Sequence, residues 1–228
     1  MEDFWMAPPM EPYIAAETAS FLVVYKPPRM HTVPLRQDKE NTLLAWIALR
    51  YPDVILVKGR KEIEGGIVHR LDYETHGLVL CARTDDAMEL LLKKQANGEI
   101  VKEYEACCYR ENNAALSGFP PLPAGLSTRV DSAFRPYGKG RKAVRPLLAE
   151  NAKYKAGEFY RTEILSCTDA GDKCFYKLRI CKGFRHQIRC HLAWIGRPII
   201  NDVLYSSFGG SGTSGFLALR ATGIVIGG

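Results

Sequence analysis

The chain has 228 residues and 46% of them are hydrophobic, so it can bury a substantial core, as one domain or two joined lobes, without a zinc ion or disulfide. Lys and Arg number 31 against 25 for Asp and Glu, and the formal net charge of +6 suits a polyanionic partner without demanding one. The sequence has no run of eighteen apolar residues and no basic-then-apolar N-terminal segment. This argues against a membrane span or a secretory signal, and we expect a cytoplasmic protein.

The seven cysteines lie mostly in apolar or alternating runs. This is typical of reduced thiols that act as small hydrophobic residues in a cytosolic protein. Cys167, Cys174 and Cys181 recur every seven residues, and Cys190 directly precedes His191, which leaves a zinc site as the alternative. No C-x2-C pair occurs, so we expect no metal.

The N-terminal part is predicted to be extended. Residues 1–19 contain prolines among acidic and aromatic residues, which favours an extended arm over a helix. Phe21–Tyr25 is an apolar run typical of a buried strand, and Lys26, Pro27 and Pro28 end it. The prolines rigidify a turn, and we expect Lys26 also to contact phosphate.

Two helices are predicted, and both are expected to serve as scaffold. Thr42 can cap a helix that runs to Arg50 and buries one apolar face. Thr84 opens a second helix that runs to about Lys94, with acids in its first turn and lysines in its last turn.

The segment Ile67–Leu80 contains two apolar runs on either side of a short polar turn, which predicts a strand, a turn and a second strand. Asp72 lies in the turn, and we expect Arg70 to keep its carboxylate ionised and oriented. Gly77 is expected to supply unusual backbone dihedral angles or a close approach where the turn rejoins the sheet. Taken alone, the segment also fits an ordinary turn with a surface Asp.

The middle of the chain is predicted to be a strand followed by a variable region. Val101–Tyr109 alternates as a strand does, and Tyr104 offers a flat stacking face and a hydroxyl, although a single strand Tyr usually belongs to the core. Residues 110–157 form a variable loop or insertion region. Within it, residues 134–146 interleave aromatic residues with five cations, which is typical of a flexible RNA-contacting loop; a plain solvated loop fits equally well.

The C-terminal third is predicted to contain a hairpin and a helix. Residues 159–167 and 174–181 alternate around a turn rich in Asp and Gly, which predicts two antiparallel strands. From Arg185 the pattern becomes helical, with Ile188 and Leu192 on one face and Arg189 on another.

Two of these segments carry a family resemblance. His69–Leu80 resembles the signature H-R-L-D-x-x-T-S-G-L-L-L of the RluA-type pseudouridine synthases. Gly183–Leu192 and Ile195–Tyr205 are similar to that family's second signature, G-R-T-H-Q-I-R-x-H-L followed by I-G-H-P-I-x-G-D-x-x-Y. Shorter likenesses lie at Lys26-Pro27, at Lys102–Tyr104, which matches a K-x-Y segment, and at Phe216–Ala221, which matches the family's last strand.

The resemblance implies an α+β fold. We expect a pseudouridine synthase catalytic domain over residues 20–228, with a mixed, largely antiparallel central sheet, flanking helices and a catalytic cleft across the sheet. Only the hairpin at residues 159–181 supports the antiparallel part from the residues themselves.

The resemblance also implies an enzyme, an RNA pseudouridine synthase that isomerises specific uridines in ribosomal or transfer RNA. The target base leaves its stack, the C1′–N1 bond breaks, the base rotates, and a C1′–C5 bond forms without any cofactor. RNA is therefore the expected partner, and a monomer is the default expectation.

The resemblance assigns roles to individual residues. Asp72 takes the central catalytic role, Arg189 pairs with it, and Tyr104 lies against the target base. Arg70 takes the place that the flipped uridine vacates. The remaining expected substrate-binding residues are His69, Thr75, His186, Gln187, Lys102 and Lys26.

The chain departs from the family pattern at flanking positions. Tyr25 and Arg29 replace Asn and Gly, His76 replaces Ser, Phe184 and Arg185 replace Arg and Thr, and Arg220 replaces His. Because Asp72 and Arg189 remain, these changes bear on substrate choice more than on chemistry.

Two other functions stay open. A catalytically inactive RNA-binding protein could keep the same fold. A hydrolase acting on free nucleosides would need a second positioned carboxylate, for which Glu74 or Asp202 could be proposed.

Overall fold

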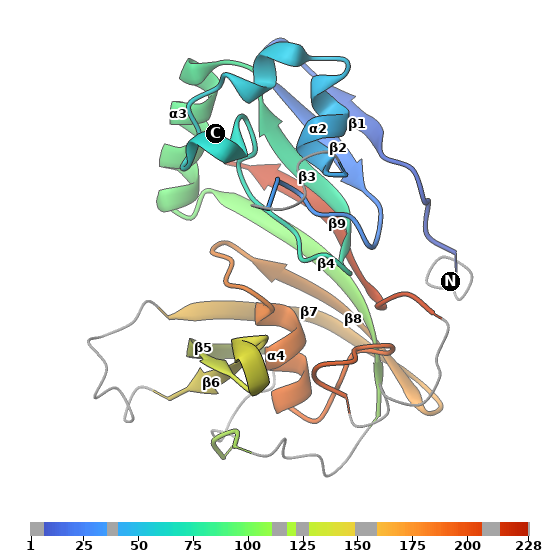
Figure 1. Cartoon of the computed structure of the whole chain (residues 1–228). Coiled ribbons are helices and arrows are strands. Elements are labelled where there is room, and N and C mark those ends of the chain that lie inside the picture. Colours follow the sequence, from blue (N-terminus) through green and yellow to red (C-terminus); the bar gives the residue numbers. More distant parts are fainter. Residues whose placement is uncertain are drawn as a thin grey trace. The chain divides into compact units, whose positions relative to one another are not determined.

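The computed structural model describes residues 7–35, 41–110, 118–121, 128–148, 159–206 and 215–227. The chain forms two compact units, the first made by Met1–Lys102 with Arg220–Gly228 and the second by Glu103–Leu219. Both units combine strands with helices (Figure 1). The predicted α+β class is confirmed.

The first unit contains a mixed sheet in the order β1 (Tyr13–Glu17), β2 (Phe21–Lys26), β3 (His76–Ala82) and β9 (Leu219–Ile226). β2 pairs antiparallel with both β1 and β3, whereas β3 and β9 run parallel. The described part of the predicted N-terminal arm is therefore extended, and it pairs with the sheet as β1. The predicted last strand begins later than expected, at Leu219.

The strand predicted over the first apolar run of Ile67–Leu80 is wrong. Ile67 forms only an isolated bridge with Cys81, and the N–H of Val68 donates to the carbonyl of Leu80 at 3.0 Å. β9 pairs with β3 at His76 and Gly77, the first two residues of β3. Ile67 and Val68 bond instead to the other end of β3, at Cys81 and Leu80, through a bridge rather than a full strand.

Gly77 lies where β3 and β9 approach each other, as predicted. Its φ is +120°, and a Cβ added there would lie 2.2 Å from the carbonyl oxygen of Ala221. Only glycine fits this conformation and this contact.

Both predicted helices of the first unit are confirmed, including their caps. α2 (Leu43–Ala48) begins after Thr42, whose hydroxyl accepts from the N–H of Ala45, and α3 (Asp85–Ala96) begins after Thr84 in the same manner. Two short 3-10 turns lie between them, η1 (Pro52–Ile55) and η2 (Glu62–Glu64). α3 packs its apolar face into a core formed by Val57, Val68, Leu80, Ala82, Ala87, Met88, Leu91 and Ile100.

β4 (Ile100–Tyr109) begins in the first unit and continues into the second. The second unit contains β8 (Lys173–Ile180), β7 (Tyr160–Ala170), β5 (Arg129–Tyr137) and β6 (Ala143–Leu147), in this order. Their pairings are antiparallel, which confirms the hairpin predicted at residues 159–181.

The basic segment at residues 134–146 is part of a hairpin rather than a flexible loop. β5 and β6 pair from Ala133 with Leu147 to Tyr137 with Ala143, and the 3-10 turn η3 (Lys139–Arg141) joins them. The interleaved aromatic residues and cations predicted a loop, whereas Pro136 and Pro146 both lie at paired positions of the hairpin.

The predicted helix in the second signature is α4 (Gln187–Trp194), which begins two residues later than expected. His186 precedes it with a φ of +57°, in the left-handed region. All eight residues of α4 are buried, including Arg189, so the helix has no exposed polar face. Among the described residues, no helix is long and apolar enough to cross a membrane.

Candidate active site

The loop that carries Asp72 is held by a buried threonine. The Oγ1 of Thr32 accepts from the N–H of Leu71 at 3.1 Å and donates to the carbonyl of the same residue at 3.0 Å. On the other side, the N–H of Thr75 donates to the carbonyl of Asp72 at 3.1 Å. Asp72 itself is half-buried, so its backbone is fixed while its side chain remains accessible.

Lys26 holds the same loop from inside. Its side chain is 0% exposed, and its ammonium group donates to the carbonyls of Pro27 at 2.9 Å, Met30 at 2.8 Å and Tyr73 at 3.3 Å. Burial lowers the pKa of Lys26 to about 7, against the attraction of the nearby Asp72 carboxylate. The expectation that Lys26 contacts phosphate is corrected, because a side chain without exposed surface cannot meet a phosphate in solution.

Arg70 is paired differently from what we expected. Its Nη1 donates to Oε1 of Glu64 at 3.0 Å, and among the described residues no ion pair joins it to Asp72. The Glu64 side chain is almost buried and needs a compensating charge more than the half-buried Asp72 does. Arg70 is itself largely exposed, as its expected contact with RNA requires.

His69 and Thr75 bring unused polar atoms to the Asp72 loop. The Nε2 of His69 accepts from the N–H of Leu80 at 3.3 Å, and burial together with the nearby Lys102 charge lowers the pKa of His69 to about 3. The neutral ring therefore carries its proton on Nδ1. That atom and the Oγ1 of Thr75 are buried without a hydrogen-bond partner in the described structure. Since buried polar groups are normally paired, a ligand group is a candidate partner for both.

Three positions that depart from the family pattern lie together in the first unit. His76 of β3 pairs in register with Arg220 of β9, and the ring of Tyr25 lies edge-on to His76 at 6.3 Å. Tyr13 of β1 stacks on Tyr25 at 4.8 Å. Burial, with the charge of the neighbouring cations, lowers the pKa of His76 to about 3, so this ring is neutral. These three departures, Tyr25, His76 and Arg220, therefore form one connected group.

In the second unit, Arg189 forms a bidentate ion pair with Asp202. Its Nε and Nη2 donate to the two carboxylate oxygens at 2.8 Å each, and the two side chains are 4% and 0% exposed. Oδ1 of Asp202 also accepts from the N–H groups of Leu204 and Tyr205. The pair therefore fixes the orientation of the guanidinium group.

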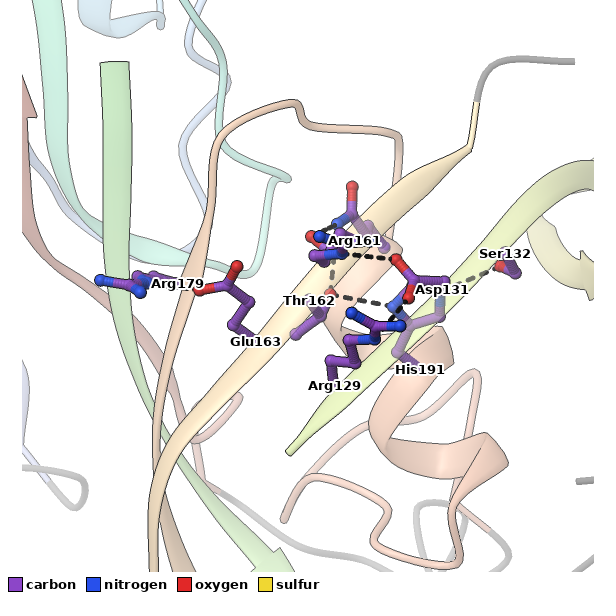
Figure 2. A network of polar contacts seen from close by, with 9 residues as sticks. Arg129, Asp131, Ser132, Arg161, Thr162, Glu163, Arg179 and His191 are labelled. Atoms are coloured by element: carbon purple, nitrogen blue, oxygen red, sulfur yellow. Dashed lines mark hydrogen bonds and ion pairs between the residues drawn. The ribbon is translucent and has the colours of Figure 1, made fainter. Parts of the chain in front are cut away.

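The residues on either side of Arg189 anchor α4 to β7 and β5 (Figure 2). Gln187 donates to the carbonyl of Arg161 at 2.9 Å and to Oγ1 of Thr162 at 3.2 Å. The ring of His191 lies 2.9 Å from the hydroxyls of both Thr162 and Ser132. Neighbouring strands are joined at the surface by the ion pairs of Asp131 with Arg161 and of Glu163 with Arg179, and Arg129 pairs with Asp131 within β5.

These contacts correct the expectation for Gln187. Its Oε1 accepts from the N–H of Phe184 at 3.0 Å, so both ends of the amide are used inside the unit and the side chain is buried. Gln187 therefore positions α4 rather than binding substrate.

The other predicted residues of the second signature and of β4 lie in ordered surroundings. Nδ1 of His186 is 3.2 Å from the hydroxyl of Tyr205, which also accepts from the N–H of Val144 at 2.7 Å. Tyr104 and Lys102 are both buried on β4.

Only two of the three regularly spaced cysteines, Cys167 and Cys174, lie in a group that could hold a metal ion among the described residues. Ligand atoms of Cys167, Asp169 and Cys174 lie within 4.8 Å of one another on the β7–β8 hairpin, whereas Cys181 is outside this group. Burial raises the pKa of Cys174 to about 11, so its thiol stays protonated near neutral pH, which disfavours metal binding.

The structure thus groups Asp72, His69, Thr75, Lys26 and Lys102 in the first unit. Tyr104, His186, Gln187 and Arg189 belong to the second. The pairing of Asp72 with Arg189 stays a prediction. Sequence reasoning missed Asp202 as the partner of Arg189, although it stands in the same signature.

Comparisons with known proteins identify the family of the chain. Residues 20–194 match the family model described as RNA pseudouridylate synthase. The chain is 29% identical over 205 residues to ribosomal large subunit pseudouridine synthase D of Yersinia pestis, with 90% of the chain and 56% of that protein covered. It is 31% identical over 180 residues to an uncharacterized RNA pseudouridine synthase of Chloroflexus aurantiacus, with 79% and 50% covered. The chain spans about half the length of these relatives.

The solved structures show the same fold. Human RNA pseudouridylate synthase domain containing 1 superimposes with a TM-score of 0.65 at 20% identity, over 96% of this chain and 80% of that chain. Human RNA pseudouridylate synthase domain containing 4 gives a TM-score of 0.64 at 16% identity, over 93% and 83%. Because the family model covers most of the chain and both signatures are present, the chain belongs to the RNA pseudouridylate synthase family.

Proposed function

We propose that this protein is an RNA pseudouridine synthase that isomerises a uridine of ribosomal RNA. The observation that carries the proposal is the Asp72 loop, in which a half-buried carboxylate stands on a backbone held by Thr32 and Lys26. The family match supports the reaction class, and the relatives named for the large ribosomal subunit favour ribosomal over transfer RNA. We expect the protein to work in the cytoplasm, where its seven cysteines would stay reduced.

Asp72 is the proposed catalytic group. The reaction breaks the C1′–N1 bond of the target uridine, joins C1′ to C5, and moves the proton lost from C5 ultimately to N1, so atoms balance without a cofactor. A carboxylate can serve as a nucleophile towards the sugar, as a stabiliser of positive charge on it, or as a base. Each route needs the ionised form of the Asp72 carboxyl group.

The other residues of the proposed site bind or position the target uridine. Arg189, oriented by Asp202, is proposed to meet the Asp72 carboxylate; two unit charges about 4 Å apart interact by about 4 kcal/mol at an effective dielectric of about 20. Tyr104 stacks on the target base, and exposed Arg70 fills the space that the base leaves. The unpaired polar atoms of His69 and Thr75 bind polar groups of the flipped nucleotide.

The hydrolase alternative is disfavoured by the ion pairs of its two candidate carboxylates. Both carboxylate oxygens of Asp202 accept hydrogen bonds from Arg189 in a buried pair, so neither oxygen is available as a general acid or base. Glu74 pairs with Arg29 at 3.7 Å on the surface.

Tritium release from ribosomal RNA labelled at C5 of uridine tests the proposal. Because C5 loses its hydrogen only when the new glycosidic bond forms, the proposal predicts release of tritium without release of free base. With an inactive RNA-binding protein, all the tritium would stay in the RNA. A hydrolase would liberate free uracil. Either result would overturn the proposal.

A further inference from the structure

The second unit contains a pocket of about 370 Å³ that the proposed chemistry does not use. It lies between the turn of the β5–β6 hairpin and the segment after Asp202. The lining residues that matter here are Tyr137, Lys139, Lys142, Val203, Leu204 and Tyr205.

One wall of this pocket is cationic. Lys139 and Lys142 are exposed on the hairpin turn, and neither has an ion-pair partner in the part of the chain that the structure describes. Nearby, the guanidinium of Arg145 lies 5.5 Å from the centre of the Tyr137 ring. An anionic group such as a phosphate diester would meet uncompensated positive charge here.

Another part of the lining is apolar although it faces solvent. Val203 is 67% exposed and Leu204 is 39% exposed, and both line the pocket together with Tyr137. Exposed aliphatic and aromatic surface beside unpaired lysines matches the two parts of a nucleotide, a flat base and a charged phosphate.

The hairpin that carries the lysines is held in place by a residue in which this chain departs from its family. Nη2 of Arg185 donates to the carbonyls of Arg141 at 2.9 Å and Ala143 at 3.2 Å. The adjacent departure, Phe184, stacks on Phe134 of β5 at 5.0 Å with an interplanar angle of 9°. The pocket is therefore preformed, and the two residues that hold its hairpin depart from the family signature.

Tyr205, which lines the pocket, also contacts Arg189. Tyr205 is buried, its ring lies 5.5 Å from the Arg189 guanidinium, and its N–H donates to Asp202. A ligand on Tyr205 would thus contact the segment that orients the proposed catalytic arginine.

We propose that this pocket binds an unpaired nucleotide of the RNA substrate other than the uridine that is isomerised. Its base packs between Tyr137 and Leu204, and its phosphates lie near Lys139 and Lys142. This subsite rests on the proposed function, because RNA is its ligand. It would select substrates by the presence of an unstacked neighbour of the target.

The first test measures binding of a fluorescent single-stranded RNA over a range of salt concentrations. The Lys139→Gln/Lys142→Gln variant should bind about tenfold more weakly and lose about 1.4 from the slope of log K against log salt, since each phosphate contact contributes about 0.7. Lys173→Gln/Lys177→Gln removes the same charge from the β7–β8 hairpin and should change binding far less. Equal weakening of both variants would overturn the proposal in favour of general charge attraction.

The second test asks whether a base occupies the pocket. RNA containing 4-thiouridine is photocrosslinked to the full chain, and peptides around Tyr137 or Leu204 should carry the crosslink. Removing the base of that nucleotide should then weaken binding about tenfold in the unaltered protein and have no effect in Leu204→Glu. Crosslinks confined to other segments, or equal losses in both proteins, would overturn the subsite.

These binding measurements do not depend on turnover. A protein that binds as described but releases no tritium would refute the proposed synthase and leave the subsite standing. A protein that releases tritium but gives no crosslink in the pocket would refute the subsite and leave the proposed synthase standing.

Discussion

Two buried ionisable residues, Lys26 and Asp202, organise the proposed site from within. Lys26 joins the Asp72 loop to β2 through three backbone carbonyls, and Asp202 joins Arg189 to the segment that follows α4. Neither residue needs to touch the RNA. Both are therefore positioning residues, and their substitution should affect stability and turnover together.

Asp202→Asn keeps an oxygen for the N–H groups of Leu204 and Tyr205 but removes the negative charge from the buried bidentate pair with Arg189. Breaking such a buried pair typically costs about 3–5 kcal/mol, so we expect a large fall in the unfolding free energy and loss of turnover. Urea unfolding and tritium release measure the two effects. Asp172→Asn, at the exposed tip of the β7–β8 hairpin, is the control and should behave as the unaltered protein does. An unchanged stability of Asp202→Asn would contradict the role of the pair.

Lys26→Met removes the donor from three carbonyls and should lower the unfolding free energy by about 1–3 kcal/mol. The pKa of Lys26 falls from 10.5 to about 7 on folding, so the unfolded chain binds more protons between these values. The cost of burying the charge is thus fully present below about pH 7 and declines as the pH rises towards 10.5. Urea unfolding at several pH values should show the unaltered protein gaining stability relative to Lys26→Met as the pH rises from 7 towards 10.5, and no such change relative to the exposed control Lys93→Met. The same pH profile in all three proteins would refute the assignment.

At this scale the sequence proposes candidate residues but not their partners in the fold. Asp72 and Arg189 are proposed from the two signatures. Arg70 was paired wrongly because nearness along the chain says nothing of Glu64, which lies buried beside it. Lys26 was read as a phosphate contact because a lysine beside prolines normally lies at the surface, and its burial is a consequence of how the Asp72 loop folds over it.

At the scale of elements, the contact between β3 and β9 depends on Gly77. Gly77→Ala would add a methyl group 2.2 Å from the carbonyl oxygen of Ala221 at a φ of +120°. Gly171→Ala is the matched control, because its φ is +66° and nothing lies within 4 Å of the added carbon. We expect the control to lose about 1 kcal/mol of unfolding free energy for the backbone conformation alone, and Gly77→Ala to lose clearly more. Equal losses in urea unfolding would mean that the close approach is unimportant.

Elements with a clear alternation or cap were predicted well, and those shaped by their neighbours were not. The helices α2 and α3 were predictable because Thr42 and Thr84 cap them through local hydrogen bonds. The run Ile67–Leu71 is apolar as a buried strand is, but only Ile67 and Val68 contact β3, at Cys81 and Leu80. The β5–β6 hairpin was missed since its pairing partner on β7 lies beyond a long variable segment.

At the scale of the whole molecule, three histidines with low pKa values link stability to pH. Burial lowers the pKa values of His69, His76 and His191 to about 3, so they remain neutral in the fold while the unfolded chain takes up protons below about pH 6.5. The unfolding free energy should therefore fall as the pH drops from 6.5 towards 3, by at most about 1.4 kcal/mol per pH unit for each histidine. His191→Gln should reduce this slope in urea unfolding between pH 7 and 5. An identical slope in that variant would contradict the buried neutral state of His191.

The architecture was predictable because two long signatures, widely separated in the chain, agree with one family. The family match and the α+β structure agree with that prediction. The features particular to this chain, the Tyr25–His76–Arg220 group and the pocket beside Tyr137, were not predictable. They arise from residues that are distant in sequence and adjacent only after folding.

The most direct measurement compares Asp72→Asn with Glu74→Gln in tritium release and in RNA binding. Both changes remove one carboxylate from the same loop, and only Asp72 is proposed to act on the uridine. Asp72→Asn should release no tritium while binding RNA within about twofold of the unaltered protein, whereas Glu74→Gln should keep its turnover. Turnover that survives in Asp72→Asn would contradict the central role of this carboxylate.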